Sequence, residues 1–160
     1  MMTKTFTLSM ICFLFLGCIE LTKGQNSSNQ QKITIEKQVD SVFHQMIKAA
    51  ENLEYDRLAQ GVDDKNNAGF IINNTYFTQF DSLINNLKSK TQGVTKQSIH
   101  IQKEKITVLS NNIALLTAFG DAKIEINSGD VITTKFYWSF VYEKTDNIWK
   151  VIQSHQSNSR

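Results

Sequence analysis

The sequence predicts an α+β fold in which helices come first and a curved, mostly antiparallel sheet follows. Between Val39 and Leu53, apolar residues recur at the three- and four-residue spacing of a helix with one buried face. After Gly93 the pattern changes to a period of two, with the β-branched and aromatic residues that strands favour. Only short turns separate the long strands, so we expect an antiparallel meander with three N-terminal helices packed on it.

The composition is that of one ordinary globular domain. The chain has 160 residues, 41% of them apolar and 20% charged, which suits a single domain with its own core. The formal net charge is +2 and the basic residues are scattered, so we expect no nucleic-acid partner. Both cysteines, Cys12 and Cys18, lie near the N-terminus, which leaves the rest of the chain without a disulfide or a cysteine metal ligand.

The first residues have the pattern of an export signal. Lys4 precedes Phe6 to Leu16, an apolar run that is too short to span a bilayer but has the length of a signal-peptide core. One interpretation is a signal peptide over residues 1–24, cleaved near Gly24. The other is a lipoprotein signal over residues 1–17, because Phe15-Leu16-Gly17-Cys18 resembles the bacterial lipobox, whose cysteine is lipidated.

Both interpretations predict export from a bacterial cell. A lipidated Cys18 would anchor the protein at the cell envelope, and this lipid would be its only link to a membrane. Residues 18–32 would then form a tether, made flexible by the Asn-, Gln- and Ser-rich stretch from Gly24 to Gln31. Cleavage near Gly24 would instead give a periplasmic or secreted protein. In both cases we expect the folded domain to span residues 33–157.

The first helix is expected to begin at Thr34, a residue suited to an N-cap. Its buried stripe runs from Val39 to Leu53. His44 lies beside Phe43 at the edge of this stripe, and we interpret it as a boundary residue rather than a ligand.

Two more helices and a short strand are expected before the sheet. The second helix would cover residues 55–59, and Phe70 to Ile72 would form a short edge strand. The third helix would cover residues 76–89, with Asn74 or Thr75 as its cap.

Four long strands follow, over residues 95–109, 113–126, 131–144 and 148–156. The alternation of the first strand slips between Ile101 and Ile106, which indicates a bulge or bend. The third strand has apolar groups on both faces: Tyr137 and Val141 on one, and on the other Phe136, Trp138, Phe140 and Tyr142. Helices cover only one face, so we expect a second copy on the other, giving a homodimer, unless loops shield it.

The last strand carries the residues that point to a family. Residues 147–157, Asn-Ile-Trp-Lys-Val-Ile-Gln-Ser-His-Gln-Ser, resemble the end of SnoaL-like and DUF4440-type proteins of the nuclear transport factor 2-like (cystatin-like) superfamily. The matching positions are Trp149, Lys150, Val151, His155 and Ser157, whereas Gln153 stands where the family often has its first histidine. The resemblance implies a cone whose cavity holds small, often apolar ligands. Some members are isomerases, cyclases or dehydratases, and many are binding or assembly modules without chemistry.

Alternation predicts which side chains would meet in that cavity. Trp149, Val151, Gln153 and His155 would share one face of the last strand. We expect Trp149, Gln153 and His155 to contact a small apolar ligand together with two residues of the third strand, Tyr137 and Ser139. The alternative for His155 is a hydrogen bond to a neighbouring strand or helix, with no ligand involved.

Catalysis is the alternative to binding, and it requires a general acid or base inside the cone. The candidates are His155, Tyr137 and Asp121, a carboxylate that is unexpected in the middle of a strand. An inward Asp121 within hydrogen-bond reach of His155 or Tyr137 would favour chemistry. The sequence has no zinc-ligand spacing, P-loop, nucleophile elbow or dinucleotide fingerprint, so we expect neither a metal nor a cofactor. We therefore prefer a binding or assembly role to an enzymatic one.

Overall fold

The computed structural model describes residues 17–159 of the chain, with side chains from residue 28 onward. The expected signal-peptide core, Phe6 to Leu16, lies outside the described residues, as do Cys12 and the side chain of Cys18. Signal processing and lipidation therefore stay predictions. The helices are α1 (Gly17–Glu51), α2 (Tyr55–Gln60) and α3 (Phe80–Lys90). The strands are β1 (Phe70–Ile72), β2 (Thr75–Phe77), β3 (Val94–Val108), β4 (Ile113–Ile126), β5 (Val131–Thr145) and β6 (Ile148–Ser159).

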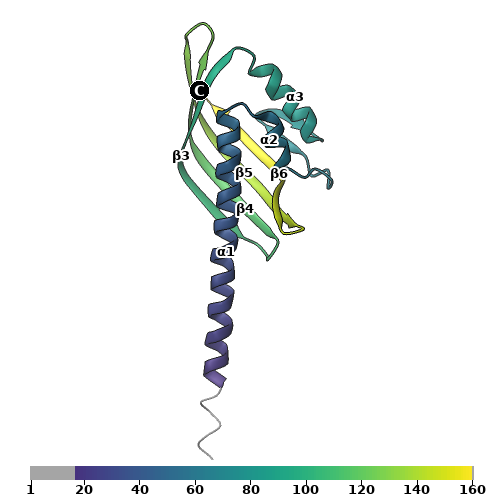
Figure 1. Ribbon diagram of the computed structural model, residues 1–160, viewed down its shortest axis with the longest axis vertical. Helices are drawn as coiled ribbons and strands as arrows, with labels where there is room; N and C mark the ends of the chain where they lie inside the picture. The colour runs from purple at the N-terminus through teal and green to yellow at the C-terminus, as the bar shows by residue number, and fades with distance from the viewer. Residues whose placement is uncertain (1–16, 160) are drawn as a thin grey trace, which may run out of the picture.

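One curved sheet with strand order β2-β1-β6-β5-β4-β3 forms the frame of the domain. β3, β4, β5 and β6 pair antiparallel in sequence order, whereas β1 pairs parallel with β6. The helices lie on one face of this sheet (Figure 1). The α+β class, with helices packed on a curved and mostly antiparallel sheet, is thereby confirmed, and the four long strands closely match the predicted ranges.

The segment before α3 differs from the prediction. Residues 75–77 form β2, which turns back on β1 and pairs Thr75 with Ile72. The turn contains Asn73, whose φ of 52° lies in the left-handed region that asparagine tolerates better than most residues. The sheet therefore has six strands rather than four, and Phe70–Ile72 lies between two neighbours rather than at an edge.

α3 consequently begins at Phe80, four residues later than the expected helix start at Tyr76. Neither Asn74 nor Thr75 caps it, because both belong to the β1–β2 hairpin. The carboxylate of Asp64 takes that role, since its Oδ2 accepts a 3.0 Å hydrogen bond from the backbone N–H of Phe80.

Helix α1 begins much earlier than expected. Thr34 lies inside it, where its Oγ1 donates a 2.9 Å hydrogen bond to the carbonyl oxygen of Gln30, so the N-cap prediction is wrong. Residues 18–32, expected to be flexible, are helical. The first buried side chain in the described part of α1 is Ile35, and the preceding turns project from the sheet (Figure 1). Between residues 17 and 159, no helix combines the length and the apolar character needed to cross a membrane.

The core forms between α1 and the helix-facing side of the sheet. Val39 and Phe43 of α1 are buried, and the Phe43 ring centroid lies 5.8 Å from that of Phe140 on β5. Trp149 of β6 is 4% exposed, and its indole N–H donates a 2.9 Å hydrogen bond to Gln38 of α1. Burying one large apolar side chain contributes about 1.5–3 kcal/mol, so these contacts hold α1 on the sheet.

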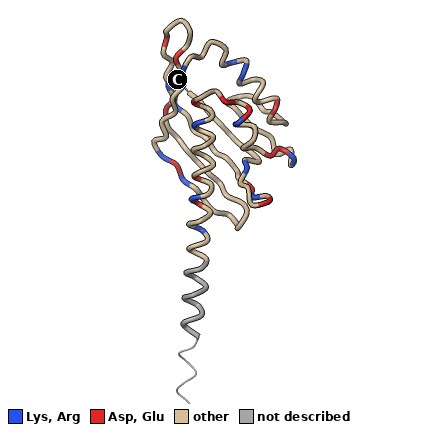
Figure 2. The backbone as a smooth tube through the Cα atoms, viewed as in Figure 1, with Lys and Arg blue, Asp and Glu red and all other residues tan. Residues whose placement is uncertain are grey.

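β3 is the outermost strand on the side of the sheet opposite β2. Its register against β4 shifts between Ile101 and Lys103, which confirms the bulge expected between Ile101 and Ile106. Near the end of α1, the Glu51 carboxylate accepts a 2.7 Å hydrogen bond from the backbone N–H of Ile99. Figure 2 shows basic and acidic residues interspersed along the chain, β3 included.

Candidate functional site

A bulge in β6 decides which side chains of the last strand point toward the helices. Tyr142 of β5 pairs with Val151, but the preceding residue Val141 pairs with Gln153, so Ile152 is an extra residue without a partner. Because side chains alternate along a strand, one extra residue reverses the face of every position that follows it.

The predicted common face of β6 is therefore wrong beyond Val151. Trp149 and Val151 are buried on the helix side, whereas Gln153 and His155 point to the opposite side. Ser154, 1% exposed, takes the inward place after the bulge. The prediction failed because it assumed an unbroken alternation along the strand.

On the helix side of the sheet, the chain's own side chains occupy the space next to α1. Tyr142 of β5 is fully buried, and its hydroxyl donates to the sulfur of Met46 at 3.8 Å. Burial raises the pKa of the Tyr142 phenol, and the nearby charge of Glu104 raises it further. Phe140 and Phe43 pack beside it. This part of the cone interior is a packed core. Trp149 lies in that core, whereas the sequence predicted that its side chain would face a ligand cavity.

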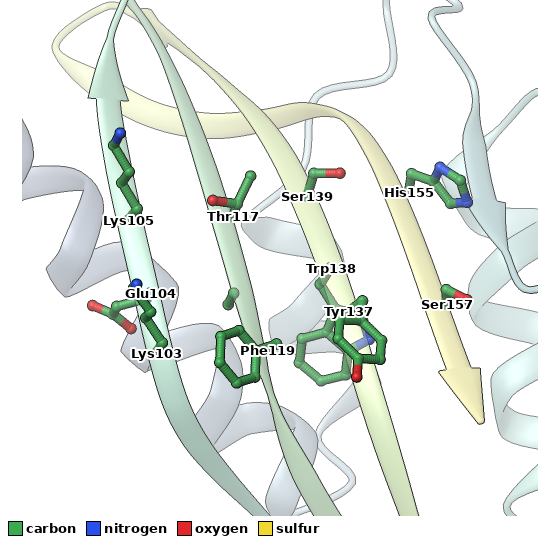
Figure 3. Close-up of a pocket in the computed structure, with 11 residues that line it drawn as sticks. Lys103, Glu104, Lys105, Thr117, Phe119, Tyr137, Trp138, Ser139, His155 and Ser157 are labelled. Carbon is green, nitrogen blue, oxygen red and sulfur yellow. The ribbon is translucent and has the colours of Figure 1, made fainter. Parts of the chain in front are cut away.

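The opposite face of the sheet carries an open groove of about 530 Å³. It crosses the middle of β3, β4, β5 and β6, and alternate residues of these strands point their side chains into it, whereas Glu104 and Trp138 line it from positions that face the helices (Figure 3). Three predicted ligand residues, Tyr137, Ser139 and His155, lie together there. Gln153 precedes His155 by two residues on the same face of β6 and pairs with Val141, outside the groove. The side chains on this side are Lys103, Lys105, Thr117, Phe119, Tyr137, Ser139, His155 and Ser157.

Strand pairing arranges the groove in rows across the sheet. Thr117 pairs with Ser139, and Ser139 pairs with His155, which gives a polar row. In the next row Phe119 pairs with Tyr137, and their rings stack with centroids 6.1 Å apart. Tyr137 is 57% exposed and Phe119 38% exposed, so an apolar aromatic floor is open to solvent beside the polar row.

β3 adds positive charge to both rows. Lys103 pairs with Phe119 and Lys105 pairs with Thr117, and both lysines are exposed. The groove therefore combines stacked aromatic rings, hydroxyls and ammonium groups on one surface. Such a surface can bind a molecule with an apolar part and an acidic part. No sequence pattern marks Lys103, Lys105 or Phe119 as site residues, because their proximity to Tyr137 depends on the strand register.

Asp121 points away from the helices, and its contacts differ from those that catalysis would require. Its Oδ1 accepts a 2.8 Å hydrogen bond from Gln102 and lies 3.4 Å from Nδ1 of His100. These hydrogen bonds, first Gln102 and then His100, hold the pKa of the Asp121 carboxyl below its ordinary value of 3.8. The three catalytic candidates do not form one site, because the hydrogen-bond partners of Asp121 are Gln102 and His100, not His155 or Tyr137.

A cluster that the sequence analysis missed lies on the other side of β3. Asp40 and His44 of α1 meet Glu104 of β3, with His44 Nε2 within 4 Å of both carboxylates. Burial raises the pKa of the Glu104 carboxyl, as does the neighbouring carboxyl of Asp40. The four-residue spacing of Asp40 and His44 was visible in the sequence, but the approach of Glu104 was not.

Comparison with known proteins places this fold among related domains. A family model described as a SnoaL-like domain matches residues 39–159. No curated protein matches the chain. Among solved structures, a nuclear transport factor 2-like superfamily protein from Salmonella enterica has a TM-score of 0.71 at 14% identity, covering 81% of this chain and 94% of that one.

Two further solved structures share the fold. A protein of unknown function from Shewanella oneidensis, described as like nuclear transport factor 2, has a TM-score of 0.57 at 19% identity and covers 76% of this chain and 98% of that one. A putative scytalone dehydratase from Novosphingobium aromaticivorans has a TM-score of 0.70 at 12% identity and covers 82% and 89%.

Proposed function

Because the chain belongs to the SnoaL-like domain family, we propose that it is a non-catalytic binding domain whose ligand site is the groove on the exposed sheet face. The family resemblance seen in the last strand is confirmed by the match over residues 39–159. The observation that carries the proposal is the stacked, exposed pair of Phe119 and Tyr137 beside Lys103 and Lys105. The groove volume of about 530 Å³ falls in the range of roughly 300–1,000 Å³ that small-molecule sites occupy.

The groove favours a flat, largely apolar molecule that carries an acidic group. Apolar rings would stack on Phe119 and Tyr137 and remove these side chains from water. An acidic group would accept charge-assisted hydrogen bonds from Lys103 or Lys105. Ser139 of the polar row offers a further donor and acceptor.

The test uses 1-anilinonaphthalene-8-sulfonate, a fluorescent aromatic sulfonate, as the probe. Tyr137→Ala is expected to weaken its binding by about two- to twelvefold, since an aromatic contact contributes about 0.5–1.5 kcal/mol beyond area burial. Lys103→Gln should weaken binding as well. Tyr76→Ala is the matched control, because Tyr76 is 58% exposed on β2, outside the groove. Equal dissociation constants of the wild type and Tyr137→Ala in fluorescence titrations would contradict the proposal.

Self-association through the same face is a second candidate. Val131, Phe119 and Tyr137 are large apolar side chains exposed on one side of the sheet, a feature of interfaces. In a two-fold dimer, each copy would bury the other's Tyr137. Tyr137→Asp should then convert a dimer into a monomer in sedimentation velocity, whereas Tyr76→Asp should not. A wild-type chain that stays monomeric at high concentration would exclude this candidate.

The two candidates are separable in one measurement. A dimer formed through this face would cover the groove, so probe binding per chain should fall as the protein concentration rises. Binding that is independent of protein concentration would favour a free groove.

An enzymatic role is the alternative, raised by the likeness to a structure named as a putative dehydratase. The positions of the candidate acid–base groups argue against it. Asp121 has a lowered pKa, so its carboxyl is ionised near neutral pH and cannot act there as a general acid. His155 and Tyr137 lie on the exposed face rather than in a closed interior. We therefore keep the non-catalytic assignment.

Export is part of the proposal. We propose that the protein is anchored at the bacterial envelope through a lipid on Cys18. Helix α1 supports this, because the 17 residue steps from Cys18 to Ile35 would span about 25 Å as a helix and hold the sheet away from a membrane. Mass spectrometry of the mature N-terminus should find a lipidated Cys18, and Cys18→Ser should release the protein from membranes. A mature chain that begins at Gln25 would replace this proposal with plain secretion.

A further inference from the structure

Three side chains with metal-binding atoms meet where α1 passes β3, on the opposite side of the sheet from the groove. Asp40 and His44 are four residues apart on α1 and therefore lie on the same side of that helix. Glu104 alternates with Lys103 and Lys105 along β3, so it points toward the helix. One atom from each of the three acidic or imidazole side chains lies within 4.8 Å of the others.

The two distances from His44 match those between ligands arranged around an ion better than those of direct hydrogen bonds. His44 Nε2 lies 3.3 Å from Glu104 Oε2 and 3.6 Å from Asp40 Oδ1. A charge-assisted N–H···O bond usually measures about 2.7–2.9 Å. Atoms in a tetrahedral shell, each about 2.0–2.2 Å from a zinc ion, are about 3.3–3.6 Å from one another.

Glu104 provides a second observation. Its Oε2 is buried and forms no well-aligned hydrogen bond among the described residues, although His44 Nε2 lies 3.3 Å away. A buried carboxylate oxygen without a partner is costly, and the neighbouring carboxylate of Asp40 adds repulsion. A divalent cation would supply the missing partner and reduce that repulsion at the same time.

We propose that Asp40, His44 and Glu104 bind a zinc-type divalent transition-metal ion. The imidazole nitrogen favours such an ion over Ca²⁺ or Mg²⁺, which prefer oxygen ligands. Three protein ligands leave a fourth position for water. The side chains of Asp40 and His44 are about half exposed, so the ion has access from solvent. The bound ion would join α1 to β3, a role independent of the groove.

The test uses the full chain, purified in the presence of a chelator and then freed of it. Calorimetric titration with Zn²⁺ should give one ion per chain, and Zn²⁺ should raise the melting temperature. Asp40→Asn, His44→Ala and Glu104→Gln should each weaken binding at least about tenfold, since the loss of even an outer partner of a metal ligand costs about 10- to 100-fold. Mg²⁺ should have no effect under the same conditions.

His100→Ala is the matched control. His100 and Asp121 form another histidine–carboxylate pair, with Nδ1 and Oδ1 3.4 Å apart, but no third ligand joins them among the described residues. This variant should bind Zn²⁺ as the wild type does. Circular dichroism of each variant checks that it is folded, and the visible spectrum of wild-type protein with Co²⁺ tests for a four-coordinate site independently of any variant. Absence of stoichiometric binding, or binding unchanged in folded His44→Ala and Glu104→Gln, would overturn the proposal.

Discussion

Ile152 is the residue on which the orientation of the last strand depends. It has no partner on β5, and the pairing continues on either side of it. Its presence places Trp149 under α1 and His155 beside the groove, although the two are separated by an even number of positions. Contributions of these two aromatic side chains to stability should therefore differ strongly.

We expect Trp149→Ala to destabilise the protein by about 3–5 kcal/mol, because it leaves a cavity in the core. It also removes the hydrogen bond to Gln38 of α1. His155→Ala should change the free energy of unfolding by less than about 0.5 kcal/mol, as is usual for an exposed residue. Urea denaturation of the two variants measures the difference. Similar losses for both would mean that the strand is not bulged at Ile152.

The Asp121 carboxyl should make the stability of the protein depend on pH. Its pKa is lowered by hydrogen bonds, first from Gln102 and then from His100. A lowered pKa in the folded state means that the interaction stabilises the protein above the ordinary value of 3.8, and that this stabilisation is lost as the pH falls through the lowered pKa. Gln102→Leu should raise the pKa of Asp121 toward 3.8, as measured by NMR titration. An unchanged pKa would assign the shift to other groups.

At the scale of elements, the long strands could be predicted because each one shows its own alternation over many residues. The β1–β2 hairpin could not be predicted, because three-residue strands are too short to show a period. Asn74 and Thr75 also fit a helix cap, which made the wrong interpretation locally reasonable. The bulge in β3 disturbed the alternation visibly, whereas Ile152 continued an apolar run and gave no such signal.

The two sites were predictable to different extents. Tyr137 and Ser139 share a face of one strand by simple alternation, so half of the groove was visible in the sequence. Phe119 joins them only through the register of β4 against β5. The contact between His44 and Glu104 joins a helix to a strand far along the chain, which no local pattern encodes.

The backbones of β3 and β4 approach each other closely at Gly120, so a larger residue there should be destabilising. A Cβ atom at position 120 would overlap the carbonyl oxygen of His100 and lie 2.8 Å from the ring of Phe136. Phe136 is fully buried, so it cannot move aside freely. Gly120→Ala should destabilise the protein by about 1–3 kcal/mol through overpacking, measured by thermal unfolding. Ala122→Gly at the next inward position is the comparison, because it removes a side chain instead of adding one. An unchanged melting temperature for Gly120→Ala would show that the β3 backbone at His100 can shift to make room for the added methyl group.

At the scale of the whole molecule, the sheet separates two environments. The helix side holds the core and the Asp40–His44–Glu104 cluster, and the other side holds the groove. Among the described side chains of α1, from residue 28 onward, Ile35 is the first that is buried in the core, and the preceding turns of the helix extend beyond the sheet (Figure 1). The stability of the domain should therefore depend on where α1 is shortened.

A chain that begins at Gln31 keeps Ile35 and Val39, so its free energy of unfolding should match that of the full chain within about 0.5 kcal/mol. A chain that begins at Asp40 lacks both side chains and should lose roughly 3–6 kcal/mol, at about 1.5–3 kcal/mol for each. Urea denaturation of the two shortened chains makes the comparison. Equal stability would mean that the contacts of Ile35 and Val39 do not hold α1 in place.

The outermost position of β3 has a consequence for how copies of the protein behave when crowded. Backbone groups along the free side of such a strand could recruit a strand from another molecule. Here the Glu51 carboxylate already occupies the N–H of Ile99, the bulge bends the strand, and Lys103 and Lys105 place charge along it. Strand pairing between the sheets of two molecules is therefore disfavoured, so contacts between copies should form through the sheet faces rather than through this edge.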